Sequence, residues 1–287
     1  MFNQILFIMH ELQKKLQNEM QLRNYSQRSI NTYLACLSRL SDYFNQTLDT
    51  ITTQQVKDYL HYRVTTHKAS VSLVNQTISA YKLLHKDVLG NDYEKINLNR
   101  PRREKRLPVI LSRDEVNSII KATKNIKHRA ILMVIYSGGL RISEVINLRI
   151  NDIDSKRMQI RINHAKGHKD RQTILSHKTL KLLREYYSYY RPNYWLFEGW
   201  KGKKYSVSSI QKVFKRSCAK ENIEKAVTVH SLRHSFATHL LEQGVSIQII
   251  QRLLGHANAK TTCVYLHVQQ YSIDKVLSPI DFKDNTL

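Results

Sequence analysis

The sequence predicts a mainly α-helical protein with a small β-sheet, divided into two lobes. Apolar residues recur every three or four positions over most of the chain, as in amphipathic helices, and alternate with polar residues only within residues 151–175. Residues 99–108 carry five basic side chains and two prolines, which disfavour helix. We therefore expect a helical lobe over residues 1–98, a basic linker over 99–108 and an α+β lobe over 109–287.

Four helices are predicted in the first lobe. The first ends near Asn24, and Ser26, Thr53 and Ser70 are candidate N-caps for the next three, because their hydroxyls can accept backbone hydrogen bonds of a first turn. Gly90 suits the end of the fourth. Several basic residues fall on the outward faces, where phosphate contact and simple solvation are both open interpretations: Arg28, Arg39, Lys57, Arg63, Lys68, Lys82 and Lys86.

The second lobe opens with a capping box at Ser112 and Glu115, which predicts a helix from about Arg113 to Lys124. An apolar helix over residues 130–136 should stop at two consecutive glycines, 138 and 139. A short helix over 140–148 should then hold Arg141 in its first turn.

A hairpin should follow, with one strand around Met158, Ile160 and Ile162 and a turn over 165–170 that carries Lys166. The remaining pattern predicts helices over these ranges: 178–190, 206–222, 231–243, 247–254 and a last one begun by Asn258.

The charge balance indicates a polyanionic partner. Lys and Arg number 46 against 23 Asp and Glu, which gives a net charge of +23. Residues 1–107 hold 16 basic and 9 acidic side chains, and residues 108–287 hold 30 and 14, so both lobes could contact nucleic acid. A proteome that is basic throughout is the alternative explanation. Three distant cysteines make neither a disulfide framework nor a zinc spacing, and no apolar run reaches membrane length, so we expect a soluble intracellular protein.

Six residues form a candidate catalytic set: Arg141, Lys166, His230, Arg233, His256 and Tyr265. Arginines can bind the non-bridging oxygens of a phosphoryl transition state through two hydrogen bonds each. A tyrosine has a pKa near 10, so it needs a base or a strongly positive field to attack phosphorus, and His230 is the candidate base. Lys166 could protonate the leaving oxygen.

Cofactor chemistry finds little support in the sequence. There is no phosphate-binding G-x-x-x-x-G-K-[ST] loop, and the H-x-x-x-H spacing of His230 and His234 lacks the glutamate of a zinc protease. Asp152 and Asp154 follow Asn151, where turn formation is the usual role. We therefore expect neither ATP nor a metal, and no other cofactor.

Five short motifs in order make the chain resemble the tyrosine recombinases of the phage integrase family, with a layout similar to the Xer recombinases. The motifs are Gly138-Gly-Leu-Arg141-x-Ser-Glu144-x-x-x-Leu148, Lys166-Gly-x-Lys169-x-Arg171, His230-x-Leu-Arg233-His-x-x-Ala237-Thr-His-Leu, Leu253-Leu-Gly-His256 and Thr261-Thr-x-x-Tyr265. The resemblance implies a four-helix SAM-like core-binding domain followed by an α+β tyrosine-recombinase catalytic domain.

The resemblance also implies roles for the six residues. Tyr265 would attack the scissile phosphate and leave a 3′-phosphotyrosyl link, Arg141, Arg233 and His256 would stabilise the transition state, His230 would be the base and Lys166 the general acid.

The partners implied are double-stranded DNA with paired core half-sites and, on that DNA, a homo-tetramer or a hetero-tetramer with a related recombinase. Four copies would exchange strands through a Holliday junction, in chromosome-dimer resolution or in integration of a mobile element. Residues 271–277 would form a small helix that docks on a neighbouring subunit. The expected location is the cytoplasm of a prokaryote, at the nucleoid. Little room remains for an integron-type insertion between Lys166 and His230, and no arm-binding domain is expected before residue 1.

Two other functions are compatible with much of this pattern. A DNA-binding protein that kept the fold but lost catalysis would not need the complete set of six residues. A type IB topoisomerase shares the chemistry but acts alone.

Overall fold

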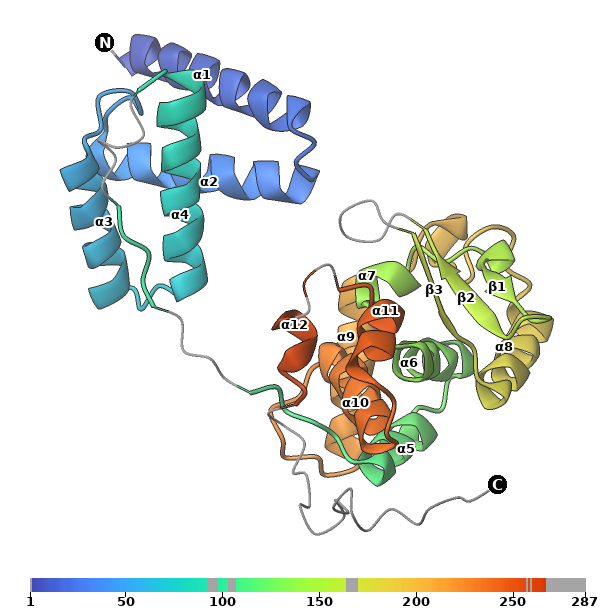
Figure 1. Ribbon diagram of the computed structural model, residues 1–287. Coiled ribbons are helices and arrows are strands. Elements are labelled where there is room, and N and C mark those ends of the chain that lie inside the picture. Colours follow the sequence, from blue (N-terminus) through green and yellow to red (C-terminus); the bar gives the residue numbers. More distant parts are fainter. Residues whose placement is uncertain are drawn as a thin grey trace, which may run out of the picture. The chain divides into compact units, whose positions relative to one another are not determined.

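The computed structural model describes residues 2–91, 98–102, 107–163, 170–256, 258 and 260–266, without the side chains of residues 2–9 and 260. The chain forms two compact units, Met1–Lys105 and Arg106–Leu287 (Figure 1). Each unit has its own hydrophobic core. The break between the units falls within the segment 99–108, whose residues 103–106 lie outside the described part. The exact bounds of the linker and of the two lobes stay a prediction.

Unit 1 is helical, and its helices are α1 (Phe2–Leu22), α2 (Gln27–Phe44), α3 (Thr53–Thr65), α4 (Val71–Leu83) and the π-helical turn η1 (Leu84–Val88). Ser26 and Ser70 cap α2 and α4 as predicted. The cap of α3 is Thr52 rather than Thr53, because the Thr52 hydroxyl accepts from the Gln55 amide and the Thr52 amide donates to the Gln55 side-chain oxygen at 2.9 Å, which completes a capping box. The fourth helix ends seven residues before Gly90, since the chain continues through η1.

The other elements of the described residues belong to unit 2: α5 (Arg113–Ala122), α6 (Ile126–Gly138), α7 (Ile142–Val145), η3 (Ile150–Asp152), β1 (Ile153–Asp154), β2 (Gln159–Ile162), β3 (Arg171–Ile174), α8 (His177–Tyr190), η4 (Trp200–Gly202), α9 (Val207–Lys220), α10 (Val229–Glu242), α11 (Ile247–Leu254) and α12 (Lys260–Cys263). None of the helices in the described residues is both long and apolar enough to cross a bilayer. The prediction of a mainly helical protein with one small sheet is confirmed.

The sheet is antiparallel with the order β1-β2-β3. Ile160 pairs with Ile153 on one side and Thr173 on the other. Strand β1 was not predicted, because it is only two residues long and follows a turn. The aspartates around it are turn residues, as expected: Asp152 accepts a hydrogen bond from the Arg149 amide, and Asp154 from that of Arg157.

Helix α6 lies in the middle of unit 2, with α10 on one side and α8 on the other (Figure 1). Its C-cap is Gly139, whose φ of +64° would be strained in a residue with a β-carbon, and a β-carbon at this position would collide with the Phe236 ring. The expected helix over 140–148 is shorter than predicted. Arg141 is its N-cap rather than part of its first turn, since the Glu144 carboxylate accepts a hydrogen bond from the Arg141 amide at 2.7 Å.

Candidate active site

A buried carboxylate, Glu144, collects three arginines at the centre of the site. Arg171 donates two hydrogen bonds to it, each 2.7 Å long, and the Arg141 guanidinium donates a third of 2.7 Å. Arg233 lies at 3.6 Å, within ion-pair distance. These side chains come from α7, β3 and α10, so one carboxylate joins three elements that are far apart in the sequence.

The cluster around Glu144 has a net positive charge. Burial opposes ionisation of Glu144, but the hydrogen bonds and charge of Arg171, helped by Arg141 and Arg233, more than offset it and lower its pKa to about 2. One carboxylate therefore faces three guanidinium groups at neutral pH. The excess of positive charge favours an anion such as phosphate.

Arg233 is almost completely enclosed, with 1% of its surface exposed. It lies on α10, ten of whose fourteen residues are buried. Its guanidinium donates to the Gly139 carbonyl at 2.6 Å and to the Leu254 carbonyl at 2.7 Å. Burial and then the charge of Arg141 lower its pKa to about 9, so it stays cationic at neutral pH. The ends of α6 and α11 thus fix this arginine in place.

His256 directly follows the left-handed Gly255 that ends α11, and it contacts Arg233. The distance from an Arg233 terminal nitrogen to His256 Nε2 is 3.1 Å, and since arginine can only donate, Nε2 must accept. Nδ1 then carries the proton and donates to the Thr262 hydroxyl at 2.9 Å. Burial and the nearby arginines lower the pKa of His256 to about 4, so the ring is neutral at pH 7.

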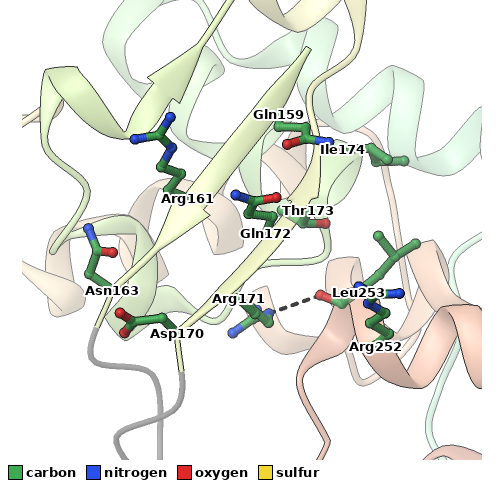
Figure 2. A pocket seen from close by; sticks show the side chains of 10 residues that line it. All are labelled: Gln159, Arg161, Asn163, Asp170, Arg171, Gln172, Thr173, Ile174, Arg252 and Leu253. Carbon is green, nitrogen blue, oxygen red and sulfur yellow. Dashed lines mark hydrogen bonds between the residues drawn. The ribbon is translucent and has the colours of Figure 1, made fainter. Parts of the chain in front are cut away.

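Arg171 also joins the sheet to α11. Its Nε donates to the Leu253 carbonyl at 2.9 Å, the contact drawn as a dashed line in Figure 2. A β-carbon at Gly255 would lie 2.5 Å from Arg171 Cδ, so the absent side chain lets the two elements approach. Beside Arg171, a groove of about 700 Å³ runs between the β2–β3 hairpin and α11, and Arg161 and Arg252 line it (Figure 2).

The Tyr265 side chain is buried, with 2% of its surface exposed, and its hydroxyl lies 3.0 Å from His234 Nδ1. The ring centroids of His234 and His230 are 4.5 Å apart, and the two rings meet edge to face. Burial raises the pKa of Tyr265, although the charges of Arg233 and Arg141 act in the opposite direction. Burial, assisted by the neighbouring positive charges, lowers the pKa of His230, and that of His234 to about 4.

Five of the six predicted residues thus gather in one region. Arg141, Arg233 and His256 belong to the cluster around Glu144, while His234 links His230 to Tyr265. The hydroxyl partner of Tyr265 is His234, which was not expected from the sequence. Lys166 lies outside the described residues, and so do residues 271–277.

Sequence reasoning gave no role to four residues that hold the site together: Glu144, Arg171, His234 and Thr262. Glu144 stands three positions after Arg141, which is the spacing of a capping box and could have identified it. His234 stands one turn after His230 on α10, so both point to the same side of the helix. Arg171 carries no comparable local signal, because its partner Glu144 is 27 positions away. Thr262 stands six positions after its partner His256, which is neither a capping nor a one-turn spacing.

Comparison with known proteins identifies the family. Residues 110–271 match the model of the phage integrase family, and residues 12–95 match that of the phage integrase N-terminal SAM-like domain. A putative integrase/recombinase, y4qK, of Sinorhizobium fredii is 34% identical over 96% of this chain and 90% of its own length. The tyrosine recombinase XerD of Staphylococcus epidermidis is 31% identical over 88% of this chain and 92% of its own length.

A solved structure shares the fold. The XerH site-specific recombinase, crystallised with a palindromic difH substrate after cleavage, aligns with a TM-score of 0.72, 23% identity and coverage of 88% of this chain and 80% of that one. The predicted domain types, an N-terminal SAM-like domain and an integrase catalytic domain, are therefore both present. The chain belongs to the phage integrase family of tyrosine recombinases and is similar to its Xer members.

Proposed function

We propose that this protein is a site-specific recombinase that cleaves and rejoins DNA through a covalent link to Tyr265. The observation that carries the proposal is the cluster of Arg141, the buried Arg233 and His256, in which the charges of the two arginines also act on the Tyr265 hydroxyl. An excess of fixed positive charge next to a tyrosine is what transfer of a phosphoryl group to that tyrosine requires.

The proposed first step exchanges one phosphodiester for another. The Tyr265 oxygen attacks the scissile phosphorus, a new phosphorus–oxygen bond forms to tyrosine, and the bond to the 5′ oxygen breaks. The tyrosine proton passes to a base, for which His230 is the candidate, and the leaving 5′ oxygen takes a proton from Lys166. Attack by a 5′ hydroxyl reverses the step and reseals the strand. Bond energy is conserved, so the proposal requires neither ATP nor a metal.

Arg141 and Arg233 are proposed to bind the phosphate in this reaction. Arg141 and Arg233 would bind the non-bridging oxygens of the phosphate, and the neutral His256 would add a donor once its proton moves to Nε2, which accepts from Arg233 in the free protein. Glu144 and Arg171 would act as positioning residues, because they contact the arginines and the end of α11 rather than the reacting atoms.

The protonated Tyr265 hydroxyl suggests that the free protein is inactive. Burial raises its pKa and so disfavours the phenolate, and its hydroxyl lies against His234. We propose that binding of two core half-sites, and assembly of four copies, homomeric or with a related recombinase, move the tyrosine onto the phosphate. Strand exchange would then pass through a Holliday junction.

The test is covalent trapping on a nicked core site, with EDTA present and ATP absent. We expect a protein–DNA adduct with the wild type and none with Tyr265→Phe. His234→Phe is a matched control, since it changes the neighbouring ring and leaves the nucleophile. Adduct from Tyr265→Phe equal to that of the wild type would refute the proposed nucleophile. Relaxation of plasmids without any core site, at catalytic rates, would instead indicate a type IB topoisomerase, and DNA binding without any adduct a catalytically silent protein.

A further inference from the structure

A tight hairpin on unit 2, residues 198–204, holds a tryptophan in solvent. Glu198 and Lys204 pair as an antiparallel bridge, and the Gly199 amide donates to the Lys203 carbonyl at 2.6 Å. The turn η4 at its tip uses a φ of +69° at Gly202. Trp200, at the start of this turn, is 82% exposed. The backbone is therefore ordered while the largest side chain of the hairpin contacts little protein.

The base of the hairpin is firmly attached. The Glu198 carboxylate accepts hydrogen bonds from the Asn193 and Tyr194 amides at 3.0 and 2.9 Å, and its carbonyl accepts one from Lys127 at 2.9 Å. The Lys204 ammonium lies 4.4 Å from the centre of the Trp195 ring. Glu198 is the only acidic residue between residues 187 and 206, and its carboxylate faces backbone amides.

Exposed aromatic and basic side chains concentrate around this hairpin. Six aromatic side chains are strongly exposed among the described residues, and five of them lie within residues 187–200: Tyr187, Tyr189, Tyr190, Tyr194 and Trp200. Four cations are exposed within residues 191–204: Arg191, Lys201, Lys203 and Lys204. An exposed indole forgoes the burial that usually stabilises a fold, so stability does not account for its position.

We propose that the hairpin 198–204 binds unpaired nucleotides, with Trp200 stacked on a base and the lysines on neighbouring phosphates. Lysine attracts any polyanion, but the flat face of an indole adds affinity only where a base exposes its own face. In a duplex those faces are covered by adjacent base pairs, and only their edges are accessible. The combination therefore favours single-stranded DNA over intact duplex. None of the hairpin residues belongs to the cluster around Glu144 or to the pair of His234 and Tyr265.

Fluorescence can test the stacking directly, because the chain has two tryptophans. The full-length Trp195→Phe variant leaves Trp200 as its single tryptophan. We expect a thymidine oligonucleotide to quench this fluorescence, and an abasic oligonucleotide of the same length, or heparin, to quench it far less. Equal quenching by the abasic strand or by heparin would reduce the site to a general polyanion surface and overturn the proposal. Preferential quenching by an acidic peptide would also overturn it, in favour of a protein partner.

Binding measurements with two variants complete the test. Trp200→Ala should weaken oligonucleotide binding about 5-fold to 100-fold, the loss of one stacked base. Lys201→Ala with Lys203→Ala should weaken it more than the matched pair Lys178→Ala with Lys181→Ala, which removes two exposed lysines from α8. Equal losses from the two lysine pairs would contradict the proposal.

This proposal and the proposed catalysis can fail separately. Trp200→Ala should still form the Tyr265 adduct on a nicked site, and Tyr265→Phe should still bind the oligonucleotide.

Discussion

The two sides of the candidate active site are held in place very differently. On the arginine side, Glu144, Arg171 and Arg233 are each fixed by several short hydrogen bonds, which together join α10 to the ends of α6 and α11 and α7 to β3. On the tyrosine side, Tyr265 follows the four-residue helix α12, and within the described part of the chain its hydroxyl has one hydrogen bond, to His234. The comparison teaches that the positive charge is set before any substrate arrives, whereas the nucleophile is held by a contact that can be exchanged.

The largest expected effect comes from removing the central carboxylate. Glu144→Gln leaves three guanidinium groups without their counter-charge, and breaking a buried ion pair in this way costs about 3–5 kcal/mol. Unit 2 holds both tryptophans, so urea unfolding followed by tryptophan fluorescence reports on it. Asp154→Asn is the control, because it removes a carboxylate whose partner Arg161 is half exposed, and we expect little change.

The difference in unfolding free energy between the wild type and Glu144→Gln should be smaller in acid. The folded pKa of Glu144, about 2, lies below its ordinary value of 4.5, so its contribution is complete above pH 4.5 and is lost as the pH falls toward 2. The stability gap between wild type and Glu144→Gln should narrow over this window. A gap that stays constant from pH 7 to the acid end would mean that the loss comes from packing rather than from charge.

Smaller losses of stability are expected from alanine substitutions at two glycines, which separate the cost of backbone strain from that of a steric clash. Gly139 and Gly244 both have positive φ angles, +64° and +81°, but a β-carbon would collide with Phe236 only at Gly139. Gly244→Ala should cost about 1–2 kcal/mol from strain. Gly139→Ala should cost about 1–3 kcal/mol more from overpacking, and it should slow adduct formation because the Gly139 carbonyl holds Arg233. Comparable losses of unfolding free energy for the two variants would show that the close contact of Gly139 with Phe236 has no special role.

The smallest effect concerns the tyrosine side. A double-mutant cycle of His234→Phe and Tyr265→Phe should give a coupling energy of about 1 kcal/mol in unfolding, the net value of one hydrogen bond. A coupling energy larger than the stability loss of Glu144→Gln would contradict the comparison. It would mean that the tyrosine is held more firmly than the arginines.

Much of the fold could be predicted from local patterns. Ser26, Ser70 and the pair Ser112 and Glu115 mark helix starts correctly, because a cap is decided within four residues. Thr53 was wrong by one position, since two adjacent threonines can both cap and the choice depends on Gln55. The π-helical turn η1 and the two-residue strand β1 have no local signature of their own.

The candidate site also has a part that could be predicted from the sequence and a part that could not. The motifs identified Arg141, His230, Arg233, His256 and Tyr265 as candidates, and the structure brings them into one region. Their roles stay predictions. The sequence could not reveal that His234, rather than His230, contacts the tyrosine, because two histidines one turn apart on α10 are equally placed until the position of α12 is known.

The hydrogen bonds of Arg233 explain why another cation would not serve at this position. An arginine has five N–H groups, and here the carbonyls of Gly139 and Leu254 and the ring of His256 account for three of them. A lysine has three, so it would use its whole supply on the protein itself. A guanidinium can contact these three partners and still has two further N–H groups, whereas an ammonium has none.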